Sequence, residues 1–307
     1  MLQTLSAKEP NDWQQRLPIR SAWIRELRSA LQETDNTKFN TSFELYRSID
    51  SLMMDVTTIG SIMARFNELF PQKSTRPGLG SNQTLIDLYG TAENILSLNE
   101  SRLALWNMDI CEVSLSSWVS LYQDMANDPI SGYFWNEDVQ TYFSTVLTFR
   151  TMLEYHSITL CWTIIMSLRL LLSDMLTLMV KTNVDGMPIN SRDKIENHRT
   201  QLMKYALNVL RTICYATHME SRSVAPFALV TAFQLTVAVL ERECNSLQAA
   251  AGSDEESTRR CEVLRVLAVR YLDWAMQNKI SVKIDLDSPR NWEFEYTASV
   301  SGNYSSL

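Results

Sequence analysis

The hydrophobic positions of this chain recur mainly at the three- and four-residue spacing of amphipathic helices. One apolar face can be followed without a break through Phe143, Val146, Phe149, Leu153, His156, Leu160, Ile164, Leu168 and Leu171. Side chains at this spacing lie on one side of a helix. The pattern predicts a long helix over about 140–180, and the nearly all-round apolar character of its second half is typical of a buried central helix.

Similar periodicity in five other stretches predicts further helices. These stretches are 43–66, 84–106, 191–216, 226–243 and 253–279. Asn190 and Ser191 are candidate caps, and Ser253 with Glu256 has the spacing of a capping box. Only eight Gly and eight Pro are present, which disfavours a turn-rich all-β architecture. We therefore predict one all-α domain over 41–283, preceded by a helical or irregular segment (1–40) and followed by a tail (284–307).

The apolar segment 155–180 is long enough to be weighed as a membrane span. It contains Arg169 and Asp174 and several Ser and Thr residues. A span needs about 20 apolar residues, and a central charge costs roughly 2.5–3.5 kcal/mol. We therefore expect a soluble core helix and no membrane contact. Arg169 has no acid at the neighbouring helical positions, so we expect it to be at least half buried and paired with an acid from a different helix.

The charge balance and the cysteines narrow the function classes. The chain has 28 Lys and Arg against 35 Asp and Glu, a net charge of −7, which argues against direct nucleic-acid binding. The densest basic spot, Arg259 and Arg260, is typical of a solvated helix face. The five cysteines are far apart in sequence and the N-terminus lacks a signal-like apolar run. We expect reduced, mostly buried thiols in an intracellular protein and no metal site.

No motif for catalysis or for cofactor binding is present, so we predict no catalytic residue and no cofactor. His198 is expected to be solvated, and His156 to be a hydrogen-bonded core residue. The aromatic cluster around Tyr133 and Trp135 is explained either by packing at a loop-to-helix junction or by a ligand pocket. Under the second alternative, the pocket would be lined by Tyr133, Trp135, His156, Trp162 and Arg169.

The predicted central helix resembles a known family. The segment YFSTVLTFRTMLEYHSITLCWTIIMSLRLLL is similar to the long central helix in the regulatory domain of fungal binuclear-zinc-cluster transcription factors, with Phe143, Phe149 and Trp162 at matching positions. Other helical segments agree in order over roughly 40–285. The family's DNA-binding module needs six closely spaced cysteines, which this chain lacks. The resemblance is thus to the C-terminal half of such a regulator.

The resemblance implies a transcription-regulating interaction module without its own DNA-binding part. A protein partner or a second copy of the chain, and a small-molecule effector, would be its ligands. Its location would be the nucleus, with the cytoplasm as the alternative, and its context a fungal secondary-metabolism gene cluster. The competing hypothesis is a helical enzyme or small-molecule-binding protein of natural-product biosynthesis. Arg169 separates the two, because the enzyme hypothesis expects it to face an open cavity without a protein partner.

Overall fold

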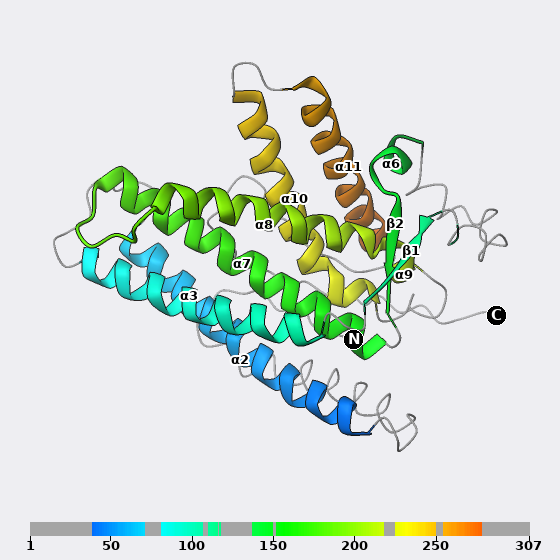
Figure 1. Ribbon diagram of the computed structural model, residues 1–307, viewed down its shortest axis with the longest axis horizontal. Coiled ribbons are helices and arrows are strands. Elements are labelled where there is room, and N and C mark those ends of the chain that lie inside the picture. The colour runs from blue at the N-terminus through cyan, green and yellow to red at the C-terminus, as the bar shows by residue number, and fades with distance from the viewer. Residues whose placement is uncertain are drawn as a thin grey trace, which may run out of the picture.

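The computed structural model describes residues 39–70, 81–106, 110–115, 117, 137–149, 152–217, 225–249 and 254–277. The predicted all-α class is confirmed, because long helices make up most of this region (Figure 1). The helices are α2 (Phe39–Leu69), α3 (Ser81–Trp106), α6 (Glu137–Tyr142), α7 (Met152–Thr182), α8 (Ser191–Arg211), α9 (Ile213–Thr217), α10 (Ala225–Ala249) and α11 (Glu255–Gln277). The two strands are β1 (Cys111–Ser114) and β2 (Thr145–Thr148).

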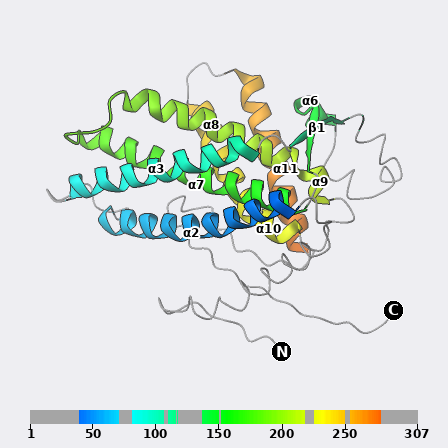
Figure 2. The ribbon, with the colours of Figure 1, turned by 60° about the horizontal axis from the view of Figure 1, so that its bottom comes forward.

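Helix α7 is the central helix of the bundle. It packs against α2, α3, α8 and α10, and Figure 2 shows α2 and α3 running side by side along it. Trp162, Ile165 and Leu168 are almost completely buried. By length and composition alone the segment Glu154–Thr182 could cross a membrane, and about two thirds of its most apolar window is buried inside the bundle. The surrounding helices therefore account for its hydrophobicity.

The upstream part of the predicted 140–180 helix is wrong. Helix α7 begins at Met152, and residues 145–148 instead form β2, which pairs antiparallel with β1 in the register Val146 to Val113. Val146 and Leu147 are both buried, so this strand lacks the alternation that reveals a half-exposed strand. The spacing of Phe143, Val146 and Phe149 mimics a helical face for that reason.

Helices α10 and α11 form an antiparallel hairpin (Figure 1). The rings of Phe233 and Tyr271 stack between them, with centroids 3.9 Å apart. At the start of α11 the carboxylate of Asp254 accepts hydrogen bonds from the Glu256 N–H (3.3 Å) and the Ser257 hydroxyl (3.1 Å). Asp254 therefore caps this helix, whereas the predicted cap Ser253 lies outside the described residues.

Candidate binding groove and buried charge clusters

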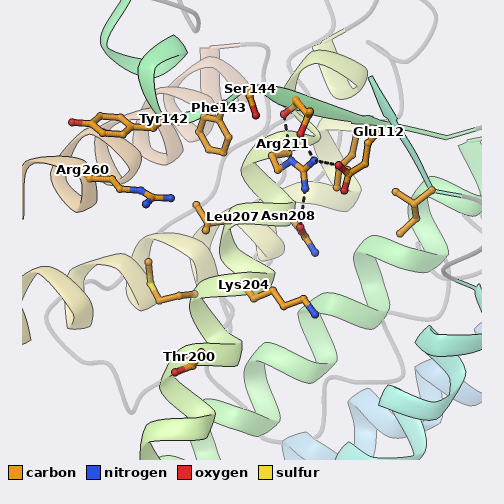
Figure 3. Close-up of a pocket in the computed structure, with 14 residues that line it drawn as sticks. Glu112, Tyr142, Phe143, Ser144, Thr200, Lys204, Leu207, Asn208, Arg211 and Arg260 are labelled. Atoms are coloured by element: carbon orange, nitrogen blue, oxygen red, sulfur yellow. Dashed lines mark hydrogen bonds and ion pairs between the residues drawn. The ribbon is translucent and has the colours of Figure 1, made fainter. Parts of the chain in front are cut away.

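A groove of about 770 Å³ opens between α8, the β1–β2 strand pair and the start of α11 (Figure 3). Its lining combines an apolar floor with several charged and polar side chains. The lining residues are Ile110, Glu112, Tyr142, Phe143, Ser144, Thr145, Leu147, Thr200, Met203, Lys204, Leu207, Asn208, Arg211 and Arg260. A concave site with an apolar body and a few polar groups is the usual form of a small-molecule site.

Helix α8 supplies one side of the groove through a polar face. Thr200, Lys204, Asn208 and Arg211 line the groove, and successive members are three or four residues apart, which puts them on neighbouring turns. The opposite face of α8 is apolar and buried against the bundle. The amphipathic pattern of this helix thus positions its polar side chains toward the groove.

Arg211 links the β1–β2 strand pair to α8. Its guanidinium lies 3.0 Å from the Glu112 carboxylate and donates to the carbonyl oxygen of Thr145 at 3.3 Å and to the hydroxyl of the same residue. A further, longer contact of 3.5 Å reaches the Asn208 side-chain oxygen, and Figure 3 shows these groups converging. Because its donors contact other residues of the protein, Arg211 has a structural role in the lining of the groove.

Lys204 and Arg260 are the cations of the groove that remain available. Both side chains are exposed. Within the described part of the chain neither forms an ion pair or hydrogen bond. Figure 3 shows Arg260 on the α11 side and Lys204 on the α8 side. The apolar part of the lining includes Phe143 and Leu147, which are buried. Such an arrangement favours a ligand with an anionic group and an apolar body.

A second charge cluster lies buried around Arg169. The residue is 5% exposed, and its guanidinium forms an ion pair with Glu100 of α3 and a 3.1 Å hydrogen bond with the Nδ1 atom of His198 of α8. The prediction that Arg169 is buried and paired with an acid from another helix is confirmed. Arg169 therefore has protein partners, whereas the enzyme hypothesis expected it to have none.

His198 was expected to be solvated, and that expectation is wrong. The residue is buried, because α8 turns this side toward α7. Burial, followed by the nearby charge of Arg169, lowers the pKa of His198 to about 4. Since a guanidinium has only donors, Nδ1 must accept the hydrogen bond, and the ring is neutral at pH 7.

Helices α2 and α3 are joined by a similar cluster. Arg102 pairs with Asp55 at 2.5 Å, and the side-chain amide of Asn99 donates to the same carboxylate at 3.0 Å. The thiol of Cys161 on α7 donates to the Asn99 carbonyl oxygen at 3.5 Å. These contacts connect three helices and explain how polar groups are accommodated here.

Two further residues of the predicted aromatic pocket, His156 and Trp162, do not line the groove. Trp162 is buried and lies edge-on to Phe149 with centroids 6.5 Å apart. His156 is also buried, as predicted, and burial lowers its pKa to about 4. The prediction that His156 is hydrogen-bonded is wrong, because neither of its ring nitrogens has a partner among the described residues. Tyr133 and Trp135 lie outside the described residues.

Sequence reasoning missed the groove cations. Arg260 was interpreted as part of a solvated helix face, and Lys204 stands on a polar face like that of any surface helix. Only the three-dimensional position of β2 and α11 brings them to one groove. Among the described residues no group of three or more His, Cys, Asp and Glu side chains is placed to hold a metal ion.

Comparisons with known proteins do not identify a family for this chain. No family model, no curated protein and no solved structure matches the chain. The functional interpretation therefore depends on the groove and on the sequence resemblance.

Proposed function

We propose that this chain is a transcription-regulating interaction module without its own DNA-binding part, and that its groove binds a small anionic effector. The observation that carries the effector site is the pair of uncompensated cations, Lys204 and Arg260, beside an apolar floor. The regulatory role is supported by the family resemblance of the helical segments. A net charge of −7 supports the absence of direct duplex binding.

The effector is expected to be an amphipathic anion. Three cations and one carboxylate line the groove, and Glu112 is already engaged by Arg211. The remaining positive charge suits a carboxylate, sulfate or phosphate group at the rim. The apolar floor would contact an aliphatic or aromatic body and supply the hydrophobic part of the affinity.

The effector site is tested with dodecanoate and dodecanol, which share an apolar chain and differ in charge. Isothermal titration calorimetry with the purified chain should give at least about tenfold tighter binding of dodecanoate, equivalent to about 1.4 kcal/mol. The double substitution Lys204→Gln and Arg260→Gln should remove that difference. Arg192→Gln, which changes an exposed cation at the start of α8 outside the groove lining, should preserve it.

Two results would contradict the effector site. Equal binding of dodecanoate and dodecanol by the parent would reduce the groove to an apolar surface. An unchanged preference in the double variant would place the anion elsewhere on the molecule.

The regulatory part is tested separately with a reporter gene. Fused to an unrelated DNA-binding domain, the chain should change transcription of a reporter carrying that domain's site. The purified chain alone should not retard duplex DNA in a gel. A salt-sensitive and sequence-selective shift by the chain alone would overturn this part of the proposal.

A further inference from the structure

Two cysteines meet between the last turns of α10 and the first turns of α11. The Sγ atoms of Cys244 and Cys261 lie 2.8 Å apart, and both residues are buried. A disulfide bond is about 2.05 Å long, so bond formation requires an approach of only about 0.8 Å. The two helices already run side by side in an antiparallel hairpin (Figure 1).

The other cysteines provide an internal contrast. Cys111 is exposed on β1, whereas Cys161 and Cys214 are buried. The Cys161 thiol is directed to the Asn99 carbonyl oxygen. Cys244 and Cys261 instead contact each other, and the Cys261 thiol also lies 3.3 Å from the Leu240 carbonyl oxygen. Their geometry thus favours a shared bond over separate packing roles.

We propose that Cys244 and Cys261 are a site of oxidation at which hydrogen peroxide converts two thiols into a disulfide between α10 and α11. In the first step a Cys244 thiolate attacks one peroxide oxygen and forms a sulfenic acid, while the other oxygen leaves and is protonated to water. The Cys261 sulfur then attacks the sulfenic sulfur and displaces the second oxygen as water. Hydrogen peroxide receives the two electrons, and the balance is two thiols and one peroxide to one disulfide and two waters.

Burial makes this reaction slow in the resting protein. It raises the pKa of both thiols, so little thiolate is present near neutral pH. Cys244 is the expected first target, because the contact between the two thiols lowers the pKa of Cys244 and raises that of Cys261. Local separation of α10 from α11 would admit the oxidant to the buried thiols. The site therefore responds to sustained oxidant and not to a brief exposure.

The bond is tested by treating the purified full-length chain with hydrogen peroxide, alkylating the remaining thiols after denaturation and mapping the peptides by mass spectrometry. We expect one cross-linked peptide pair, containing Cys244 and Cys261, that disappears after treatment with dithiothreitol. Cys111 reports whether the oxidant dose was sufficient, since its thiol is exposed. Full alkylation of Cys244 and Cys261 at a dose that oxidises Cys111 would overturn the proposal.

Matched variants and a melting experiment test whether the bond fits the folded hairpin. Cys111→Ser should retain the cross-link, whereas Cys261→Ser should leave a Cys244 sulfenic acid that dimedone traps. A disulfide closing a loop of this length should raise the melting temperature of the oxidised parent by about 5–10 °C relative to the reduced parent. An unchanged or lower melting temperature of the cross-linked parent would show that the bond strains the hairpin, against the proposal.

Discussion

Charged residues near the two opposite faces of α8 have contrasting surroundings. On the bundle side, Arg169 is buried, and its terminal nitrogens contact Glu100 and His198. On the groove side, Lys204 and Arg260 are exposed, and no carboxylate of the described residues neutralises them. A buried cation without its partner is strongly destabilising, whereas an exposed cation is hydrated at little cost.

This difference separates charges that maintain the fold from charges that remain available for a ligand. The cluster around Arg169 connects α3, α7 and α8, so its loss should be measured as instability. Lys204 and Arg260 form no ion pair with the described residues, so their loss should be measured as weaker binding. Arg211 is intermediate, because it lines the groove and also links α8 to the β1–β2 strand pair.

The largest effect is expected for Arg169→Ala. Removing the guanidinium leaves Glu100 without its cation in a partly buried position and removes the hydrogen bond to His198. The free energy of unfolding should fall by about 3–5 kcal/mol, measured by urea denaturation. Arg65→Ala serves as the control, because the Arg65–Glu68 pair is largely exposed and should change stability by no more than about 0.5 kcal/mol. A variant as stable as the parent would remove the contrast between the two sides.

The next effect concerns acid. The pKa of both His156 and His198 is about 4 in the folded chain, below the ordinary value of 6.5. The unfolded chain therefore binds more protons, so stability is full above about pH 6.5 and is lost as the pH falls toward 4. Each histidine should contribute a loss of about 3 kcal/mol.

His156→Leu isolates one of these contributions. Because its ring nitrogens have no hydrogen-bond partner among the described residues, leucine sacrifices no such bond there. The stability of the variant should decline less steeply between pH 6.5 and 4 than that of the parent, by about 3 kcal/mol in total. Parallel curves from urea denaturation across this pH range would contradict the lowered pKa.

A smaller loss is expected for Arg211→Gln. The substitution removes the pair with Glu112 and weakens the contacts with Thr145. Since Glu112 is mostly exposed, the unfolding free energy should fall by only about 1–2 kcal/mol. Hydrogen exchange of the β1 and β2 amides should increase at the same time. Unchanged exchange there would argue against the proposal that Arg211 links the β1–β2 strand pair to α8.

The smallest stability effect is expected for Lys204→Gln and for Arg260→Gln. Each should change the unfolding free energy by less than about 0.5 kcal/mol, because the side chains are exposed and make no ion pair with the described residues. Thermal melts of the two variants and the parent should coincide closely. A large loss of stability in either would show that the cation has a structural partner and would remove it from the proposed effector site.

The helices were predictable where their periodicity is strong and local. The apolar stripe predicted for α7 identified its buried face at Ile164, Leu168 and Leu171. Arg169 was predicted to pair with another helix because no acid stands at the neighbouring positions of its own helix. The identity of its partners was not accessible, since Glu100 and His198 come from other helices. The buried face of α8 at His198 was missed for the same reason, as polar neighbours in sequence hid it.

The strand pair and the groove depend on contacts between distant segments. β2 was misread as helix because Val146 and Leu147 are both buried and its partner β1 lies far upstream in sequence. The groove forms where the β1–β2 strand pair meets α8 and α11. No local pattern distinguishes Lys204 or Arg260 from ordinary surface cations, so the site required the assembled fold.

Reversing the groove charge tests the central claim most directly. Calorimetric titration of dodecanoate and of dodecylamine, which share an apolar chain, should show that the parent prefers dodecanoate by at least about tenfold. The double substitution Lys204→Glu and Arg260→Glu should invert this preference toward dodecylamine, while Arg192→Glu should leave it in favour of dodecanoate. The same ligand preference in the parent and the double variant would contradict the assignment of the groove as the anion-binding site.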